Sequence, residues 1–221
     1  MPKYIDTIYS EKLRPFTKYP SQLCGYLFGR FGMKKGDKVL EVGCGRGDFL
    51  KGFKELGLDA YGLDREKTVS EQLNGIELQY RDVEKEKFPY GDGTFDVVFS
   101  KSLIEHLIDP GNFMQECHRV LKPGGRIIIM TPDWGSLMKI FFDDYTHRQP
   151  YTVCAVKDLL NIFNFKDSGS EIFYQLPIIW KYPALKTVSR IIRFFVPVTT
   201  KSSIKFIRWS VELMILGTGV K

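Results

Sequence analysis

Hydrophobic positions along the chain follow two spacings, and the changes between them predict alternating strands and helices. Short apolar runs typical of buried strands cover residues 38–42, 59–64, 76–80, 95–100, 126–130 and 170–174. Apolar residues at helical spacing follow the first run and recur over about 20–31, 111–121 and 153–163. Beyond residue 176 three prolines interrupt the pattern, so no seventh strand can be placed there. The alternation indicates an α/β chain.

A glycine-rich turn joins the first strand to the first helix without a spare residue. Gly43, Gly45 and Gly47 alternate, whereas a dinucleotide site requires Gly-x-Gly-x-x-Gly. Here the third glycine comes one residue early, and Asp48 stands where that motif needs glycine. Asp48 and Glu41 would place negative charge beside the ligand, which suits a cation better than a pyrophosphate. An ordinary βα turn remains the alternative explanation.

The stretch Glu41-Val-Gly-Cys-Gly-Arg-Gly47 resembles motif I of the class I S-adenosylmethionine (SAM) dependent methyltransferases, Glu/Asp-x-Gly-x-Gly-x-Gly. The run 95–132 is similar to their core pattern, and Arg119-Val-Leu-Lys-Pro-Gly-Gly125 is especially close. The resemblance covers roughly residues 36–132. It implies a doubly wound, Rossmann-like, mostly parallel sheet of the class I methyltransferase type with a helical C-terminal extension. The implied cofactor is SAM, whose sulfonium and ammonium agree with the acidic turn.

Residues at strand ends complete the expected cofactor site. Asp64 ends the second strand, where an acid can accept hydrogen bonds from both ribose hydroxyls; a helix N-cap is a compatible role. Asp82 matches the family's adenine-binding acid, followed by the backbone N–H of Val83, although an acid in a turn would look the same. The resemblance implies the following cofactor-binding residues: Glu41, Gly43, Cys44, Gly45, Gly47, Asp64, Arg65, Asp82, Val83, Ser100 and Lys101.

A segment beyond the fifth strand gathers aromatic residues, two acids, a histidine and an arginine over residues 141–152. It resembles the Asp-x-Thr-His-x-Arg-Pro-Tyr/Phe-Thr segment of sugar- and polysaccharide-modifying methyltransferases, except that Arg follows His directly here. Histidine has the pKa required of a base that deprotonates a hydroxyl. The expected catalytic residues are His147 as first choice of base, His106 as second and Asp144 as orienter; the expected substrate contacts are Tyr145, Arg148 and Tyr151. A loop that only caps a helix through Thr152 is the plainer alternative.

These features predict a SAM-dependent methyltransferase that transfers a methyl group in line to a sugar, a glycan or another small hydroxyl acceptor. The alternatives are C-methylation of a quinone or lipid-type substrate and a non-catalytic SAM-binding partner module. Base-amine methylation is disfavoured because Ser100-Lys-Ser-Leu103 does not match Asp/Asn-Pro-Pro-Tyr. A nucleic-acid partner is therefore not expected, and a homodimer is left open.

Positive charge is concentrated in the last fifty residues. The net charge is +6, and residues 172–221 carry eight Lys/Arg against one acid, Glu212. Two basic amphipathic stretches, around 186–196 and 201–212, are too short to cross a bilayer. They would either lie in a membrane interface, near a lipid-linked glycan acceptor, or pack on the sheet. The expected division is an extension (1–35), a SAM-binding core (36–176) and a basic helical tail (177–221).

Cysteine and histidine usage bears on compartment and metal content. Four scattered cysteines form no Cys-x-x-Cys pair, and no secretory signal is recognised, which favours reduced thiols and a cytoplasmic protein, with peripheral membrane contact as an option. The three histidines do not combine with the cysteines at ligand spacing, so no metal site is expected. Aromatic residues of the extension would cover the cofactor cleft or pack on the sheet: Tyr4, Tyr9, Phe16 and Tyr19.

Overall fold

The computed structural model describes residues 15–67, 73, 75–200 and 202–221. A seven-stranded sheet in the order β3-β2-β1-β4-β5-β7-β6 runs through these residues. Its strands are β1 (Lys38–Val42), β2 (Asp59–Asp64), β3 (Glu77–Tyr80), β4 (Phe95–Lys101), β5 (Leu121–Pro132), β6 (Lys166–Phe173) and β7 (Met214–Val220). β1 to β5 pair in parallel, and β7 is antiparallel to β5 and β6. The predicted doubly wound, mostly parallel sheet is confirmed.

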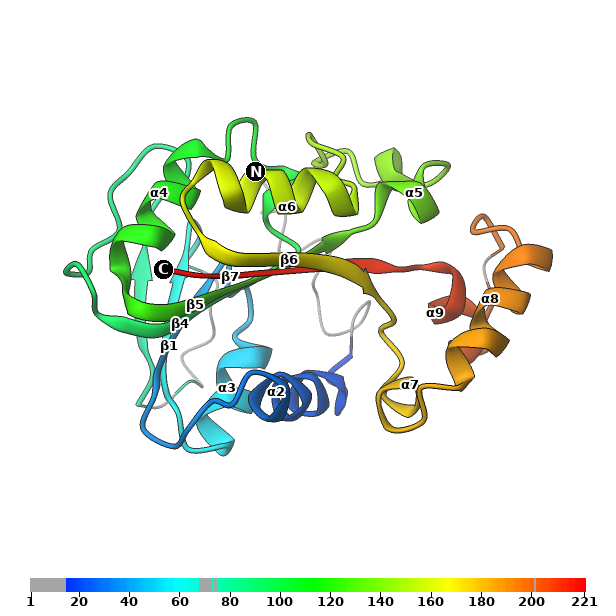
Figure 1. Cartoon of the computed structure of the whole chain (residues 1–221), viewed down its shortest axis with the longest axis horizontal. Coiled ribbons are helices and arrows are strands. Elements are labelled where there is room, and N and C mark those ends of the chain that lie inside the picture. Colours follow the sequence, from blue (N-terminus) through cyan, green and yellow to red (C-terminus); the bar gives the residue numbers. More distant parts are fainter. Residues whose placement is uncertain (1–14, 68–72, 74, 201) are drawn as a thin grey trace.

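Helices cover both faces of this sheet (Figure 1). One face carries α2 (Tyr19–Arg30) and α3 (Asp48–Glu55), and the other carries α4 (Gly111–Val120) and α6 (Val153–Ile162). The remaining helices are short pieces or lie beyond one end of the sheet: η1 (Ile104–His106), α5 (Trp134–Leu137), η2 (Phe141–Asp143), α7 (Pro177–Lys181), α8 (Leu185–Phe195) and α9 (Lys205–Val211).

Buried side chains of the strands pack alternately against the two helix layers, because successive side chains of a strand point to opposite faces of the sheet. In β4, Val98 packs into the cluster under α4 and α6, whereas Val97 and Phe99 pack into the cluster under α2 and α3. Ile127 and Ile128 of β5 divide in the same way. With both faces covered, the parallel edge at the strands' carboxyl ends is left for a ligand.

Two features of the sheet differ from the sequence prediction. The Lys122-Pro-Gly-Gly break lies inside β5 as an irregularity, since pairing jumps from Phe95–Leu121 to Val97–Arg126. The predicted helical tail of 177–221 is wrong for its last residues, which form β7 between β5 and β6. Pairing on both sides compensates for the two glycines of the run Met214-Ile-Leu-Gly-Thr-Gly-Val220. The core sheet therefore extends past residue 176.

The helices between β6 and β7 form a small unit of their own, with a cluster around Leu176, Ile179 and Leu213. The buried residue of α8 is Ser189, whose hydroxyl accepts a 2.9 Å hydrogen bond from Ser210 of α9. α8 thus packs through a small polar residue, and most of its large apolar side chains are exposed. A helix that packs on the sheet would bury its apolar face, whereas α8 exposes most of that face.

The N-terminal aromatic residues take separate places. Phe16 lies against the guanidinium of Arg46 in the glycine-rich turn, with 4.5 Å between the guanidinium carbon and the ring centroid. Tyr19 instead packs edge-on against Trp209, at 4.9 Å between ring centroids. The contact of Phe16 agrees with the expectation that the extension covers the cofactor cleft. The contact of Tyr19 agrees with the alternative, in which the aromatic residues only pack. Tyr4 and Tyr9 lie outside the described residues.

Candidate active site

The glycine-rich turn after β1 has the conformation that its sequence requires. Gly43, Gly45 and Gly47 have φ angles of 77°, 49° and 76°, in the left-handed region that other residues rarely adopt. A side chain at Gly47 would collide with Leu73, and one at Gly43 would come within 3.1 Å of Leu103. The backbone can therefore approach a ligand closely only with glycine at these positions.

Acidic groups surround this turn. Glu41 is 2% exposed, and its Oε2 has no hydrogen-bond partner in the structure. Burial, followed by the nearby charges of Asp48 and Asp64, raises the pKa of Glu41 well above its usual range. Asp48 itself pairs with Arg46 at 2.8 Å. A buried carboxyl with one unpaired oxygen, beside a glycine turn, fits a cationic cofactor such as SAM and does not fit a pyrophosphate.

The two acids expected at the nucleoside both end strands at this edge. Asp64 accepts hydrogen bonds from the backbone N–H groups of Gly45 (2.8 Å) and Glu66 (3.0 Å). A carboxylate has about four acceptor positions, so two stay available for ribose hydroxyls. Asp82 accepts from the N–H of Glu84 at 3.1 Å, and Val83 beside it is buried. Both acids thus accept backbone hydrogen bonds from the loops that follow their strands.

Some of the other residues expected to contact the cofactor have structural contacts instead. The Ser100 hydroxyl is buried and donates to the carbonyl of Val42 at 3.0 Å, which ties β4 to β1. Cys44 is buried beneath the turn. The Lys101 ammonium lies 5.8 Å from the Phe49 ring centroid, and the Arg65 side chain is largely exposed. Ser100 therefore positions the turn through β1, and its hydroxyl is already engaged.

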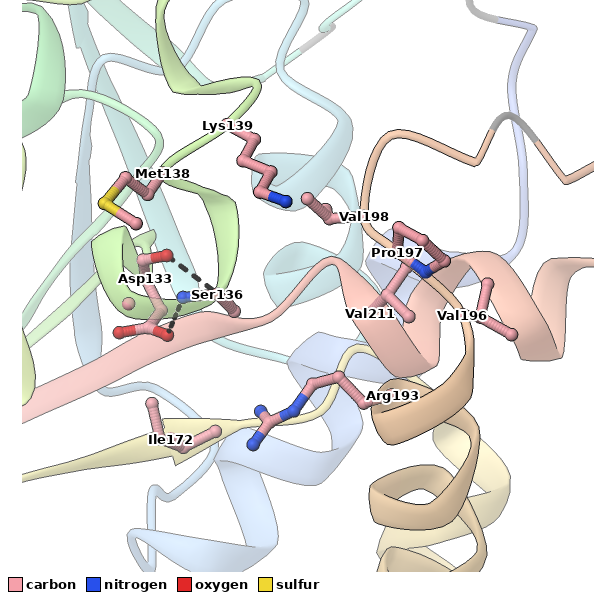
Figure 2. A pocket seen from close by; sticks show the side chains of 11 residues that line it. Asp133, Ser136, Met138, Lys139, Ile172, Arg193, Val196, Pro197, Val198 and Val211 are labelled. Atoms are coloured by element: carbon pink, nitrogen blue, oxygen red, sulfur yellow. Dashed lines mark hydrogen bonds between the residues drawn. The ribbon is translucent and has the colours of Figure 1, made fainter.

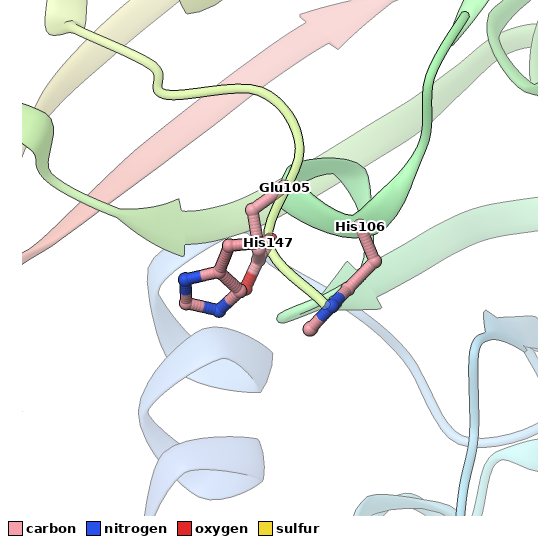
Figure 3. A group of neighbouring side chains, drawn as sticks. All are labelled: Glu105, His106 and His147. Carbon is pink, nitrogen blue, oxygen red and sulfur yellow. The ribbon is translucent and has the colours of Figure 1, made fainter. Parts of the chain in front are cut away.

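Glu105, His106 and His147 come together beyond the end of β4 (Figure 3). Glu105 and His106 belong to η1, and His147 comes from the loop after η2. The two imidazole rings have centroids 4.8 Å apart, and the His147 ring also lies 4.4 Å from that of Phe141. The structure thus joins both predicted base candidates in one site. Glu105 was missed by the sequence reasoning, although it stands next to His106 in the Glu-His-Leu pattern.

Hydrogen bonds orient each histidine through a different partner. His147 Nδ1 is 2.6 Å from the Phe141 carbonyl oxygen. His106 Nδ1 is 2.9 Å from the hydroxyl of Thr146, which in turn donates to Asp144 at 2.6 Å. The Asp144 carboxylate is therefore linked through Thr146 to the His106 ring. The Asp144 carbonyl, in contrast, accepts from the backbone N–H of His147 at 3.1 Å. Thr146 is a further residue that the sequence reasoning did not single out.

Burial shapes the ionisation of this cluster. Burial raises the pKa of Glu105 to about 7. Hydrogen bonds to its carboxyl group, including one from Thr131 at 2.9 Å, lower the pKa but do not offset burial. Burial also lowers the pKa of His106, and the neighbouring His147 lowers it further. Both shifts favour the neutral forms of Glu105 and His106.

The expected acceptor contacts differ in exposure. Tyr145 is exposed, and Arg148 beside it donates to the Tyr145 carbonyl at 3.4 Å. Tyr151 is buried in the core under α6, and burial raises its pKa to about 12. The charge of Glu105 also raises this pKa, and the substrate contact expected of Tyr151 stays a prediction. Thr152 caps α6 as predicted, accepting from the N–H of Ala155 at 3.2 Å.

A pocket of about 440 Å³ opens beside the carboxyl end of β5 (Figure 2). Asp133, Lys139 and Arg193 supply its charged groups, and most of its other side chains are apolar. Trp134, next to Asp133, packs edge-on against Phe141 at 5.4 Å, and Phe141 contacts His147. The same loop therefore borders the pocket and the histidine cluster.

Glu41 leads to a testable pH dependence. Because the pKa of Glu41 is raised on folding, the folded cofactor-free protein favours the protonated side chain. Protonated Glu41 therefore stabilises the folded state at low pH, and this stabilisation is lost as the pH rises through the raised pKa. A bound cation favours the carboxylate, so SAM binding should release one proton below this pKa, with affinity rising by up to tenfold per pH unit. Titration calorimetry in buffers of different ionisation enthalpy measures the released proton.

Glu41→Gln should bind SAM more weakly, remove this proton release and gain stability relative to the unmodified protein as pH rises. Asp59→Asn, at the opposite end of β2, is the matched control and should leave the proton release intact. Equal proton release by Glu41→Gln and the unmodified chain would show that another group is responsible.

Sequence comparison places this chain near known methyltransferases. The family profile described as "Methyltransferase domain" matches residues 40–129. A ubiquinone biosynthesis O-methyltransferase of Pseudomonas aeruginosa is 31% identical over 103 residues, which cover 43% of this chain and 44% of that protein. The corresponding Caulobacter sp. protein is 34% identical over 104 residues, covering 44% and 41%. The chain thus spans less than half the length of these relatives, and their names mention no sugar.

Comparison of folds extends over the whole chain. A SAM-dependent methyltransferase from Archaeoglobus fulgidus has a TM-score of 0.68 at 22% identity, covering 99% of this chain and 100% of that one. Phosphoethanolamine N-methyltransferase 2 of Haemonchus contortus, in complex with SAM, has a TM-score of 0.68 at 18% identity, covering 99% and 59%. Residues 40–129 therefore match a methyltransferase domain, and the fold of the chain is similar to that of known SAM-dependent methyltransferases.

Proposed function

We propose that this chain is a SAM-dependent O-methyltransferase whose acceptor is a hydroxyl on an amphipathic, quinol-type molecule reached from a membrane surface. The observation that carries the proposal is the Glu105–His106–His147 cluster at the carboxyl edge of the sheet, on the edge that bears the glycine-rich turn. The names of the relatives support O-methylation and a quinone-related acceptor.

Methyl transfer from a sulfonium needs alignment, exclusion of water and loss of the acceptor's proton. SAM supplies the electrophilic methyl group when bound. Glu41 and Asp64 would hold its cationic and ribose portions. A carbonyl can only accept a hydrogen bond, so His147 Nδ1 donates to Phe141, and the neutral ring has its lone pair on Nε2. That lone pair can take the hydroxyl proton as the oxygen bonds to the methyl carbon.

The pocket beside β5 supports an acceptor with both apolar and polar parts. Ile172, Val196, Pro197 and Val211 provide apolar walls, and Lys139 and Arg193 reach toward the space from two sides (Figure 2). A ring with an apolar tail would fill such walls better than a hydrated glycan. A glycan acceptor stays the second candidate because of the likeness of residues 144–152 to sugar-modifying enzymes.

The activity test starts with the cofactor. Calorimetric titration of the full chain with SAM should give saturable binding, and methyl-labelled SAM should then label a short-chain dihydroxybenzene in preference to an oligosaccharide. Labelling of the oligosaccharide alone would replace the quinol-type acceptor by a glycan. A folded protein with no measurable SAM binding would contradict methyltransferase activity altogether.

α8 supports the membrane part of the proposal. Val188, Ile191, Phe194 and Phe195 are 43–83% exposed. By helical spacing they form one stripe, and Lys186, Arg190 and Arg193 form a second stripe along its border. An amphipathic helix with exposed aromatic residues and a basic border matches the charge and polarity of an anionic membrane interface. Among the described residues, no helix combines the length and apolar content that a membrane span requires.

Vesicle binding tests this surface. The full chain should co-sediment with vesicles that contain anionic lipid at low salt and be released at high salt, since each basic residue near the bilayer contributes about 1 kcal/mol. Replacing both Phe194 and Phe195 by serine should lower the binding constant at least tenfold. Ile162→Ser, at an equally exposed position on α6, should leave it unchanged. A chain that stays in the supernatant at low salt would show that the acceptor is met in solution.

A further inference from the structure

The three side chains at the end of η1 and in the loop after η2 have the composition of a metal site. Glu105, His106 and His147 each offer one ligand atom, and these atoms all lie within 4.8 Å of one another. In Figure 3 the three side chains converge from two separate segments. Two atoms that bind one zinc ion at about 2.0–2.2 Å lie at most about 4.4 Å apart, so these side chains need to close only slightly to share an ion.

The neighbouring hydrogen bonds place the ring proton on the same nitrogen, Nδ1, in both histidines. Phe141 offers only a carbonyl oxygen to His147 Nδ1, which must therefore carry the ring proton. The single hydroxyl proton of Thr146 is donated to the Asp144 carboxylate, so Thr146 accepts from His106 Nδ1. Each neutral ring then has its lone pair on Nε2. Metal-bound histidines usually donate their other N–H to a carbonyl or a carboxylate-linked group in this manner.

The carboxylate is held in a similar way. Glu105 is 1% exposed, and its Oε2 accepts a 2.9 Å hydrogen bond from the Thr131 hydroxyl at the end of β5. The loop that carries His147 is fastened to η1, because the N–H of Arg148 donates to the Glu105 carbonyl at 2.7 Å. A buried carboxyl group beside two imidazole lone pairs places several electron-donating atoms together, and a bound cation would favour the ionised carboxylate.

We propose that Glu105, His106 and His147 bind one divalent transition-metal ion, with Zn²⁺ as the preferred class. Two imidazoles and one carboxylate suit this class better than Mg²⁺ or Ca²⁺, which prefer oxygen ligands. Three protein ligands leave an open coordination position, the arrangement of catalytic rather than structural zinc sites. This departs from the sequence expectation of no metal, which considered only histidine and cysteine spacing.

The role of the ion rests on the proposed function, whereas its binding does not. The acceptor hydroxyl would take the open position, and the positive charge would ease loss of its proton to water. The oxygen would then bond to the methyl carbon as the carbon–sulfur bond breaks and its electron pair returns to sulfur. In this arrangement His147 holds the ion and is not itself the base.

The test uses Co²⁺ as a spectroscopic probe and Zn²⁺ for metal analysis, on the full chain without SAM or acceptor. The chain should bind one equivalent and show visible Co²⁺ absorption. Glu105→Gln and His147→Ala should weaken binding on the order of 100-fold or more, and Thr146→Val about 10–100-fold through the orientation of His106. His118→Ala is the control, because this histidine lies on α4 against Phe165. Cys154→Ser controls for binding by the exposed thiol.

SAM binding by the same variants reports whether each remains folded, and Thr146→Val serves where a ligand variant does not fold. Absence of stoichiometric Co²⁺ binding by a folded, SAM-binding chain would overturn the site. Equal binding by the ligand variants and the unmodified chain would overturn it too. Metal binding with no methyl transfer to any hydroxyl acceptor would leave the site standing and contradict the proposed function. Transfer undiminished by a chelator that removes the metal would contradict the ion's role.

Discussion

Asp64→Ala should weaken SAM binding at least tenfold. Asp64 sits at the carboxyl end of β2, and its carboxylate braces the glycine-rich turn through the N–H of Gly45 at 2.8 Å. Its remaining acceptor positions are expected to bind the ribose hydroxyls. Charge-assisted hydrogen bonds to the two hydroxyls would contribute about 1.5–3 kcal/mol each, so loss of even one accounts for a tenfold effect. Titration calorimetry with SAM measures the change.

The structure adds a stability effect that the sequence did not indicate. From sequence alone, Asp64→Ala is expected to change the thermal stability of the cofactor-free protein little. The carboxylate also accepts from the N–H of Glu66, so the alanine variant leaves two backbone donors without their partner. Asp64→Asn keeps one carbonyl acceptor and should lose less stability. A SAM dissociation constant equal to that of the unmodified chain in both variants would show that the ribose is held elsewhere.

His147→Ala should lower the rate constant of methyl transfer by about 10²–10⁴-fold, the usual contribution of a group that handles the acceptor's proton. The same loss follows whether His147 takes the proton itself or holds an ion. SAM affinity should stay within about threefold, because the predicted cofactor contacts lie on the glycine-rich turn and at or beyond the ends of β1 to β4, and none lies in the loop that carries His147. Single-turnover kinetics with saturating SAM separates the two quantities.

His118→Ala provides the comparison for this variant, since it removes an imidazole of the same chain outside the cluster. It should keep the full rate of methyl transfer. Full activity of His147→Ala would remove the cluster from the mechanism. A parallel loss of SAM binding and rate would instead indicate that His147 supports the fold of the loop.

Local sequence determined the strand, turn and helix at residues 38–55. Alternating glycines permit a tight turn with positive φ, which other residues disfavour, and the structure has such angles at all three positions. The Thr152 cap of α6 was likewise predictable, because its partner is three residues away. The position of Asp64 followed from the end of an apolar run. Such features depend on neighbours in the chain, which a sequence displays directly.

Only the tertiary structure decided the features that depend on distant partners. The run 214–220 becomes a strand because β5 and β6 offer free edges on either side of it. Periodicity identified the apolar stripe of α8, but what covers a stripe depends on packing, and Ser189 rather than that stripe faces α9. Glu105 and His147 meet because the loop after η2 folds back onto η1. Residues far apart in the chain become neighbours through the packed fold, which composition and spacing do not specify.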